Sequence, residues 1–169
     1  MFVKLFSDGA CSGNGKEGNC PGGYGTILQA FNNGQIVAER EYSQGYINTT
    51  NNRMELLGVI KGLESLTKPC DIEIISDSKY VIDAFNQKWI DSWIKNGWKN
   101  SKKDPVKNRD LWERLLELIK PHNVKFTWVK GHNDHEENER CDKLAVNAYS
   151  GENLIIDEGF THQTNYFYS

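Results

Sequence analysis

Four acidic residues stand at places along the chain where carboxylates can take part in catalysis. Asp8 and Asp77 each follow a short apolar run, whereas Glu55 and Asp142 lie near the starts of two amphipathic stretches. If the two apolar runs form neighbouring strands, Asp8 and Asp77 leave the sheet side by side, and helices can bring the other two above them. Crowded carboxylates repel one another unless a cation lies among them, and oxygen ligands suit Mg²⁺ or Mn²⁺. The four acids are therefore candidate ligands of divalent metal.

Each acid also has a purely structural interpretation. Glu55 completes a helix-capping pattern, and Asp77 could cap the helix that follows it. Asp142 could be a surface charge in a polar first turn, and Asp8 a turn residue. Spacing alone leaves both interpretations open.

The apolar pattern predicts the elements that must position these acids. Alternating or continuous apolar runs predict five strands, at residues 1–7, 24–31, 35–43, 71–76 and 123–129. Helical spacing predicts helices near 56–66, 78–85, 108–120 and 139–149, with one more in the Trp-rich stretch between. Asn-Asn-Gly at 32–34 predicts a hairpin, and the glycine-rich segment 9–25 predicts a loop.

This order of elements predicts an α/β fold. Three consecutive strands imply an antiparallel portion, and strand–helix–strand steps imply parallel additions. We expect a mixed five-stranded sheet, three antiparallel strands plus two parallel, flanked by helices. The domain is expected at residues 1–149, followed by an aromatic C-terminal tail at 150–169 without clear periodicity.

Composition narrows the class of protein. The 169 residues are 38% hydrophobic and 25% charged, as in ordinary globular domains. No apolar run approaches the roughly 20 residues that cross a membrane, and no signal peptide is recognised, so we expect a cytoplasmic protein without a membrane partner. The cysteines have no zinc-site spacing and are expected as thiols. Cys11 and Cys20 flank the glycine-rich loop, so they are the pair to examine for a disulfide.

Charge is unevenly distributed. The net charge is −3, yet one segment is strongly basic. It contains Lys88, Lys95, Lys99, Lys102, Lys103, Lys107 and Arg109. Such a segment is either a localised anion-binding face or a solvated helix surface.

Five segments at these positions resemble type 1 ribonuclease H of the bacterial kind, over about residues 1–148. They are Ser7–Ala10 (SDGA), Thr49–Leu56 (TTNNRMEL), Ser76–Tyr80 (SDSKY), Trp128–His132 (WVKGH) and Asn138–Asp142 (NERCD). The second, fourth and fifth strings are specific, whereas Asp-Gly and Asp-Ser alone are weak signals.

The resemblance implies the ribonuclease H fold and a monomeric endoribonuclease. Such an enzyme hydrolyses the RNA strand of RNA–DNA hybrids and leaves 5′-phosphate and 3′-hydroxyl ends. It implies two Mg²⁺ or Mn²⁺ ions with substrate bound, held by Asp8, Glu55, Asp77 and Asp142. His132 matches a catalytic histidine that assists product or proton exchange.

The resemblance also implies a set of substrate contacts. They are Asn14, Thr50, Asn51, Asn52, Lys79, Trp93 and Asn108. Asn14, Asn51, Asn52 and Lys79 would approach the backbone or minor groove near the cut, where 2′-hydroxyls identify RNA. Lys79 stands where the family has Gln. Thr50 and Asn108 match a DNA-phosphate pocket, and Trp93 is expected near the deoxyribose track. We expect Trp89 and Trp112 in the core.

Three other interpretations compete with this one. A DNA exonuclease or integrase-like enzyme would share the acids but not the asparagine pair or the basic Trp-rich segment. A non-catalytic RNA–DNA hybrid-binding module would be expected to have lost an acid. An α/β domain with capping acids would show no metal-dependent activity.

Overall fold

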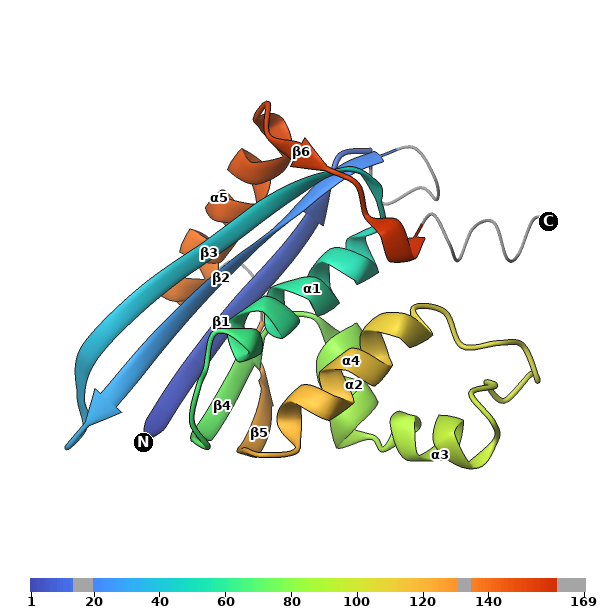
Figure 1. Cartoon of the computed structure of the whole chain (residues 1–169), viewed down its shortest axis with the longest axis horizontal. Helices are drawn as coiled ribbons and strands as arrows, with labels where there is room; N and C mark the ends of the chain where they lie inside the picture. The colour runs from blue at the N-terminus through green and yellow to red at the C-terminus, as the bar shows by residue number, and fades with distance from the viewer. Residues whose placement is uncertain (14–19, 131–134, 161–169) are drawn as a thin grey trace.

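Helices cover both faces of a six-stranded sheet in the computed structural model (Figure 1), which describes residues 1–13, 20–130 and 135–160. The strands are β1 (Phe2–Cys11), β2 (Cys20–Asn32), β3 (Gln35–Thr49), β4 (Asp71–Ser76), β5 (Asn123–Trp128) and β6 (Leu154–Ile155). Their order across the sheet is β5-β4-β1-β2-β3-β6. The first three strands are antiparallel, and β4 and β5 add to β1 in parallel. The expected mixed sheet is confirmed.

The sheet has one strand more than the five expected. β6 pairs in parallel with β3 through only two residues. A run of that length has no periodicity that a sequence can show.

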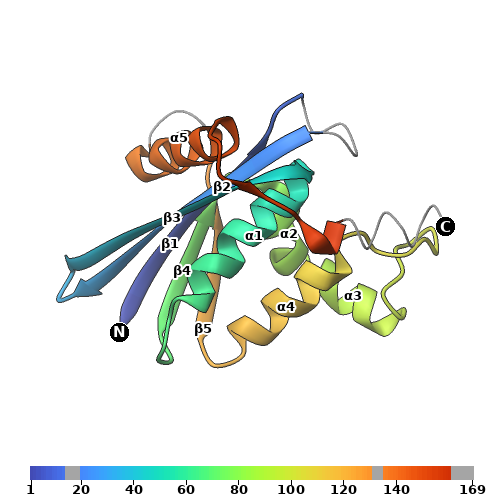
Figure 2. The same cartoon turned by 45° about the horizontal axis from the view of Figure 1, so that its top comes forward.

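Within the described parts of the chain, five helices connect and flank these strands. They are α1 (Asn51–Glu64), α2 (Lys79–Asn86), α3 (Trp89–Lys95), α4 (Arg109–Ile119) and α5 (Glu136–Ser150). Figure 2 shows α5 on one face of the sheet, with α1, α2, α3 and α4 on the other. No helix among the described residues is long and apolar enough to cross a membrane.

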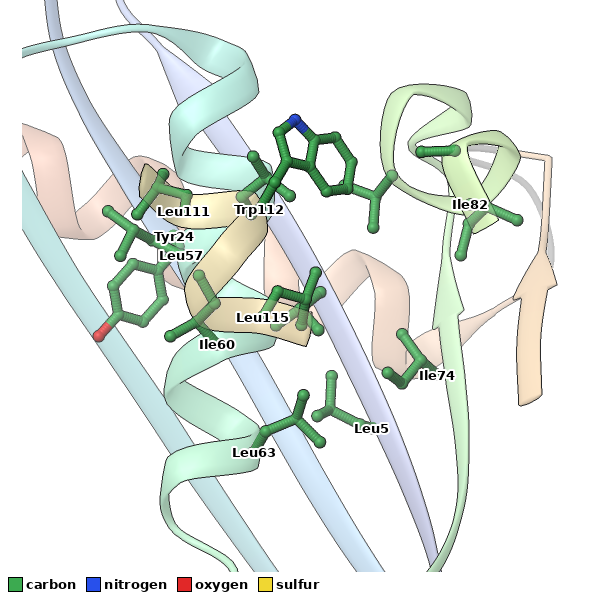
Figure 3. Packing of buried hydrophobic residues seen from close by; sticks show 14 of the residues in the cluster. Leu5, Tyr24, Leu57, Ile60, Leu63, Ile74, Ile82, Leu111, Trp112 and Leu115 are labelled. Carbon is green, nitrogen blue, oxygen red and sulfur yellow. The ribbon is translucent and has the colours of Figure 1, made fainter. Parts of the chain in front are cut away.

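Alternating side chains of the central strands pack into two separate hydrophobic cores. Leu5 and Ile74 join the large cluster beneath α1 and α4 (Figure 3), whereas the adjacent Phe6 and Ile75 join a small cluster with Cys141 beneath α5. Successive strand residues point to opposite faces, so each strand anchors helices on both sides. The sheet therefore fixes α1 and α5 relative to one another.

Both ends of the glycine-rich segment are strand rather than loop, which corrects the expectation for residues 9–11 and 20–25. β1 continues to Cys11 and β2 begins at Cys20, with Asp8 opposite Gly25 in the antiparallel register. Asp8 therefore lies inside β1, not after it. Main-chain pairing needs no side chain, so glycine can remain in the ladder where a neighbouring helix needs the space. The structure joins none of the four cysteines in a disulfide.

Candidate active site

Two glycines let α1 and α5 approach Asp8 closely. A Cβ on Gly9 would lie 2.5 Å from the main-chain nitrogen of Glu55, so a side chain there would push away the first turns of α1. A Cβ on Gly25 would lie 2.2 Å from the main-chain oxygen of Cys141 in α5. The two absent side chains therefore allow helices on opposite faces of the sheet to deliver Glu55 and Asp142 to one end of β1.

Strand register places Asp77 beside Asp8. In the parallel β1–β4 pair, Phe6 lies opposite Ile75. Two residues further along each strand, the register brings the chain to Asp8 and Asp77. The two acids therefore lie side by side where β4 ends, with Asp77 just after β4 and Asp8 still within β1.

Three of the acids lie within metal-binding distance of one another. Carboxylate oxygens of Asp8, Glu55 and Asp77 all lie within 4.8 Å of one another. Asp142 lies close enough to the same group for its charge to raise the pKa of Asp8. The structure thus brings all four predicted acids together, three in a tight group and Asp142 at its side.

The environment of these acids disfavours their charged forms. Burial, followed by the charges of Asp77 and Asp142, raises the pKa of Asp8 to about 8. Burial and the charges of Asp8 and Asp77 also raise the pKa of Glu55 well above its usual range. A cation in the group would reverse this balance, because it favours the ionised carboxylates.

The structural interpretations of these acids do not describe their positions. The N-cap of α1 is Thr50, whose hydroxyl accepts from the main-chain nitrogen of Arg53, so Glu55 lies beyond the capping pattern. Ser78, not Asp77, caps α2, and its hydroxyl accepts from the main-chain nitrogen of Val81. Asp142 lies in the second turn of α5, which begins at Glu136 rather than at residue 139 as expected.

The donor set fits a hard divalent cation. Glu55 is 7% exposed, and among the described residues its Oε2 has no hydrogen-bond partner. A buried carboxylate oxygen without a partner is costly, and a metal ion removes that cost. All four side chains offer oxygen, the ligand type of Mg²⁺ and Mn²⁺.

Comparison with known proteins agrees with this geometry. The chain matches the RNase H family model over residues 2–150. The chain belongs to the RNase H family. A ribonuclease H of Lachnoclostridium phytofermentans is 55% identical over 157 residues, which cover 93% of this chain and 98% of the relative. A ribonuclease H of Pseudoalteromonas atlantica is 51% identical, with 94% and 97% covered.

Solved structures give the same family. LC9-RNase H1, described as a type 1 RNase H with the type 2 active-site motif, has a TM-score of 0.78 and 31% identity, covering 96% of this chain and 80% of that chain. The expected family and fold are therefore confirmed. As a member of the RNase H family, the chain is an endoribonuclease.

Arg53 is a buried cation close to this RNase H site, and no pattern in the sequence indicated a role for it. Arg53 is 1% exposed. Its guanidinium donates to both carboxylate oxygens of Asp157, at 2.8 and 3.1 Å, and to both of Asp110, at 2.9 and 2.8 Å. Thr49 also donates to Asp157, at 2.7 Å. Arg53 lies two residues before Glu55, so these bonds join the start of α1 to α4 and to the C-terminal segment.

The residues predicted to form the DNA-phosphate pocket both bond to Arg53. Thr50 accepts from its main-chain nitrogen, and the buried Asn108 accepts from its Nη1 at 3.3 Å. Asn108 also donates to the hydroxyl of Tyr80 at 3.0 Å. Arg53 therefore links the two predicted pocket residues, although much of the Asn108 amide is engaged inside the protein.

The other predicted contact residues are distributed around the acids. Asn51 and Asn52 are exposed in the first turn of α1, and Lys79 is exposed at the start of α2. Asn14 and His132 lie outside the described residues.

The basic segment projects from the body next to α4. Its lysines and Arg109 are all exposed, from Lys88 at the N-cap of α3, through α3 and the following loop, to Arg109 at the start of α4 (Figure 1). Trp93 is half-buried and packs edge-on against the fully buried Trp112, with ring centroids 5.5 Å apart. Trp89 is 40% exposed, so its expected place in the core was wrong, whereas that of Trp112 is confirmed.

Proposed function

We propose that this RNase H family member hydrolyses the RNA strand of RNA–DNA hybrids endonucleolytically, as a monomer, giving 5′-phosphate and 3′-hydroxyl ends. The observation that carries the proposal is the approach of Asp8, Glu55 and Asp77 to within 4.8 Å, with Asp142 beside Asp8. Two divalent cations, Mg²⁺ or Mn²⁺, would supply activation of water and neutralisation of phosphate charge there.

Residues of the chain are proposed to bind the metal ions and to recognise the RNA strand. The four carboxylates hold the ions, with Glu55 offering its unpartnered buried oxygen. The exposed amides of Asn51 and Asn52 can both donate to and accept from 2′-hydroxyls, which separates RNA from DNA at the cut. Asn14 is proposed to contact the same groove.

A separate group of residues is proposed to contact the DNA strand. Thr50 and Asn108, joined by Arg53, would face a DNA phosphate, and Trp93 would line the deoxyribose track. The exposed lysines of the basic segment would add phosphate contacts, so binding should weaken steeply with salt.

A substrate panel tests this function. RNA-labelled hybrid, single-stranded RNA, duplex RNA and duplex DNA are each incubated with protein and Mg²⁺, Mn²⁺ or EDTA, and the product ends are mapped. Metal-dependent cutting of hybrid RNA alone, leaving 3′-hydroxyl ends, is expected. Hybrid binding without cutting would favour the binding module, and cutting of duplex DNA would favour an exonuclease or integrase-like enzyme.

His132 is proposed to assist product or proton exchange rather than to act as the main base. The variant His132→Ala should therefore cut the hybrid more slowly than the wild type but much faster than Asp8→Asn. Equal loss of activity in both variants would contradict this division of roles.

A further inference from the structure

The indole of Trp128 makes two contacts with the turn that carries Asp77. Trp128 ends β5, opposite Ser76 at the end of β4. Its Nε1–H donates to the main-chain oxygen of Asp77 at 3.1 Å. The Nζ of Lys79 lies 4.8 Å from the centroid of its ring. Strand β5 therefore holds both the acid and the first residue of α2.

The neighbouring hydrogen bonds give this contact a specific place in the turn. The main-chain nitrogen of Val129 donates to the oxygen of Ser76, and the nitrogen of Ser78 donates to the hydroxyl of Ser76, each at 3.0 Å. These bonds hold the residues before and after the acid. The indole bond acts on the main chain of Asp77 itself, and so on the direction in which its carboxylate leaves the turn.

Burial is a poor explanation for a tryptophan at this position. Trp128 is 42% exposed, and it belongs to neither of the two buried clusters. An aliphatic side chain of similar size could cover the same surface, but it could neither donate to a carbonyl nor attract an ammonium group. Both of those contacts of Trp128 go to the turn at the acidic group.

The position of Lys79 suits a phosphate contact. The four acids repel the phosphodiester that has to approach them, and an ammonium two residues from Asp77 offsets that repulsion locally. A lysine side chain is flexible, so holding it over an aromatic ring reduces the ordering needed when phosphate binds. Lys79 is exposed, so its side chain can reach the substrate.

We propose that Trp128 is a positioning residue of the cleavage site, which orients Asp77 for metal and Lys79 for a backbone phosphate beside the cut. This inference rests on the proposed function, because it assumes that nucleic acid occupies the acidic site. Its two contacts can be separated, since phenylalanine keeps a ring beneath Lys79 but lacks the N–H.

Three variants test the inference with two measurements that need no cleavage. Mn²⁺ binding is measured by calorimetry, and hybrid binding by fluorescence anisotropy in EDTA over a salt series. Trp128→Phe should weaken Mn²⁺ binding about 5-fold, the usual effect of one lost hydrogen bond, and keep the wild-type salt slope. Lys79→Gln should keep Mn²⁺ affinity within about 2-fold and lower the slope by about 1. Trp128→Leu should show both effects.

The matched control is Lys68→Gln, which removes an exposed charge before β4 rather than after it. It should change neither quantity. Wild-type Mn²⁺ affinity and salt slope in both Trp128 variants would overturn the inference, as would equal effects of Lys68→Gln and Lys79→Gln. If Trp128→Leu fails to fold by circular dichroism, Trp128→Phe and Lys79→Gln still decide the question.

Cleavage is then measured separately on the same proteins. Trp128→Phe should lower kcat at limiting metal and recover at high metal, whereas Lys79→Gln should mainly raise KM. A wild-type protein that binds Mn²⁺ and hybrid but cuts nothing would refute the proposed function while leaving the binding results to decide the role of Trp128. A wild-type protein that binds neither would overturn both.

Discussion

Arg53 and Asp157 form a buried ion pair between residues 104 positions apart, with the guanidinium 2.8 and 3.1 Å from the two carboxylate oxygens. Both side chains are almost fully buried. Asp157 also accepts from Thr49 and from the main chain of Phe160. The segment after α5 is therefore tied directly to the helix that carries Glu55.

Loss of Asp157 should destabilise the fold strongly. Asp157→Ala leaves a buried arginine with one carboxylate fewer, so we expect the free energy of unfolding to fall by about 3 kcal/mol. Urea unfolding of the metal-free protein measures the change. Glu117→Gln, which removes an exposed ion pair with Lys120, serves as the control and should change stability by less than about 0.5 kcal/mol. A similar small effect of Asp157→Ala would contradict a structural role for the pair.

Gly25→Ala should separate α5 from the sheet. The added methyl would meet the main chain of Cys141 at 2.2 Å, and main chain cannot move aside as a flexible side chain can. We expect a loss of about 2–3 kcal/mol in stability, as in an overpacked core, together with weaker Mn²⁺ binding because Asp142 moves with α5. Gly151→Ala is the control, since its Cβ would lie 3.5 Å from the main-chain oxygen of Asn147, an ordinary van der Waals contact. Equal effects of the two substitutions would disprove the close-approach explanation.

Asp8→Asn should stabilise the metal-free protein at alkaline pH. The pKa of Asp8 is raised in the folded state to about 8, so the folded protein binds this proton more tightly than the unfolded chain. The resulting stability is complete below the ordinary pKa near 4 and is lost as pH rises towards 8. The variant should therefore gain about 1–2 kcal/mol at pH 8, allowing for solvent screening, and nearly nothing at pH 4.

Thermal unfolding in EDTA checks this pH dependence. A gain of 1–2 kcal/mol corresponds to about 2–8 °C in Tm for a chain of this size. Saturating Mn²⁺ should reverse the ranking, because wild type has the additional metal ligand. A gain that is the same at pH 4 and pH 8 would exclude electrostatic repulsion as its cause.

Charge removal in the basic segment should act on binding rather than on the fold. Lys99, Lys102 and Lys103 are exposed beyond α3. Replacing all three with Gln should reduce the slope of log affinity for hybrid against log salt by about 2–3, with Tm nearly unchanged. Lys120→Gln, on the exposed end of α4, is the control. An unchanged slope would indicate a solvated surface instead of a phosphate-binding face.

Much of this architecture could be predicted from local pattern. The strands around Leu5 and Ile74 and the helix with Trp112 contain many apolar residues at regular spacing, so their type was predicted correctly. The acids at positions 8 and 77 could be placed together because strand pairing follows from element order. Boundaries near glycine were less accurate, because glycine at 23 and 25 indicates a loop locally but allows the close approach of α5 in three dimensions.

The remaining features depend on contacts between distant residues. Nothing near Arg53 in the sequence shows that Asp157 lies against it, since an acid in an aperiodic segment looks like any surface charge. The two contacts of Trp128 likewise arise only when β5 pairs with β4. The expected burial of Trp89 failed because helical spacing does not say which face of a short helix meets the core.

Single-turnover cleavage of an RNA-labelled hybrid in Mg²⁺ tests the central claim most directly. Asp8→Asn is compared with wild type and with Asp71→Asn, which changes an exposed acid at the opposite end of β4. If the acidic group holds the catalytic metal, Asp8→Asn should cut at least about 10³-fold more slowly while Asp71→Asn cuts at the wild-type rate. An Asp8→Asn protein that cuts within about 10-fold of wild type would contradict the account.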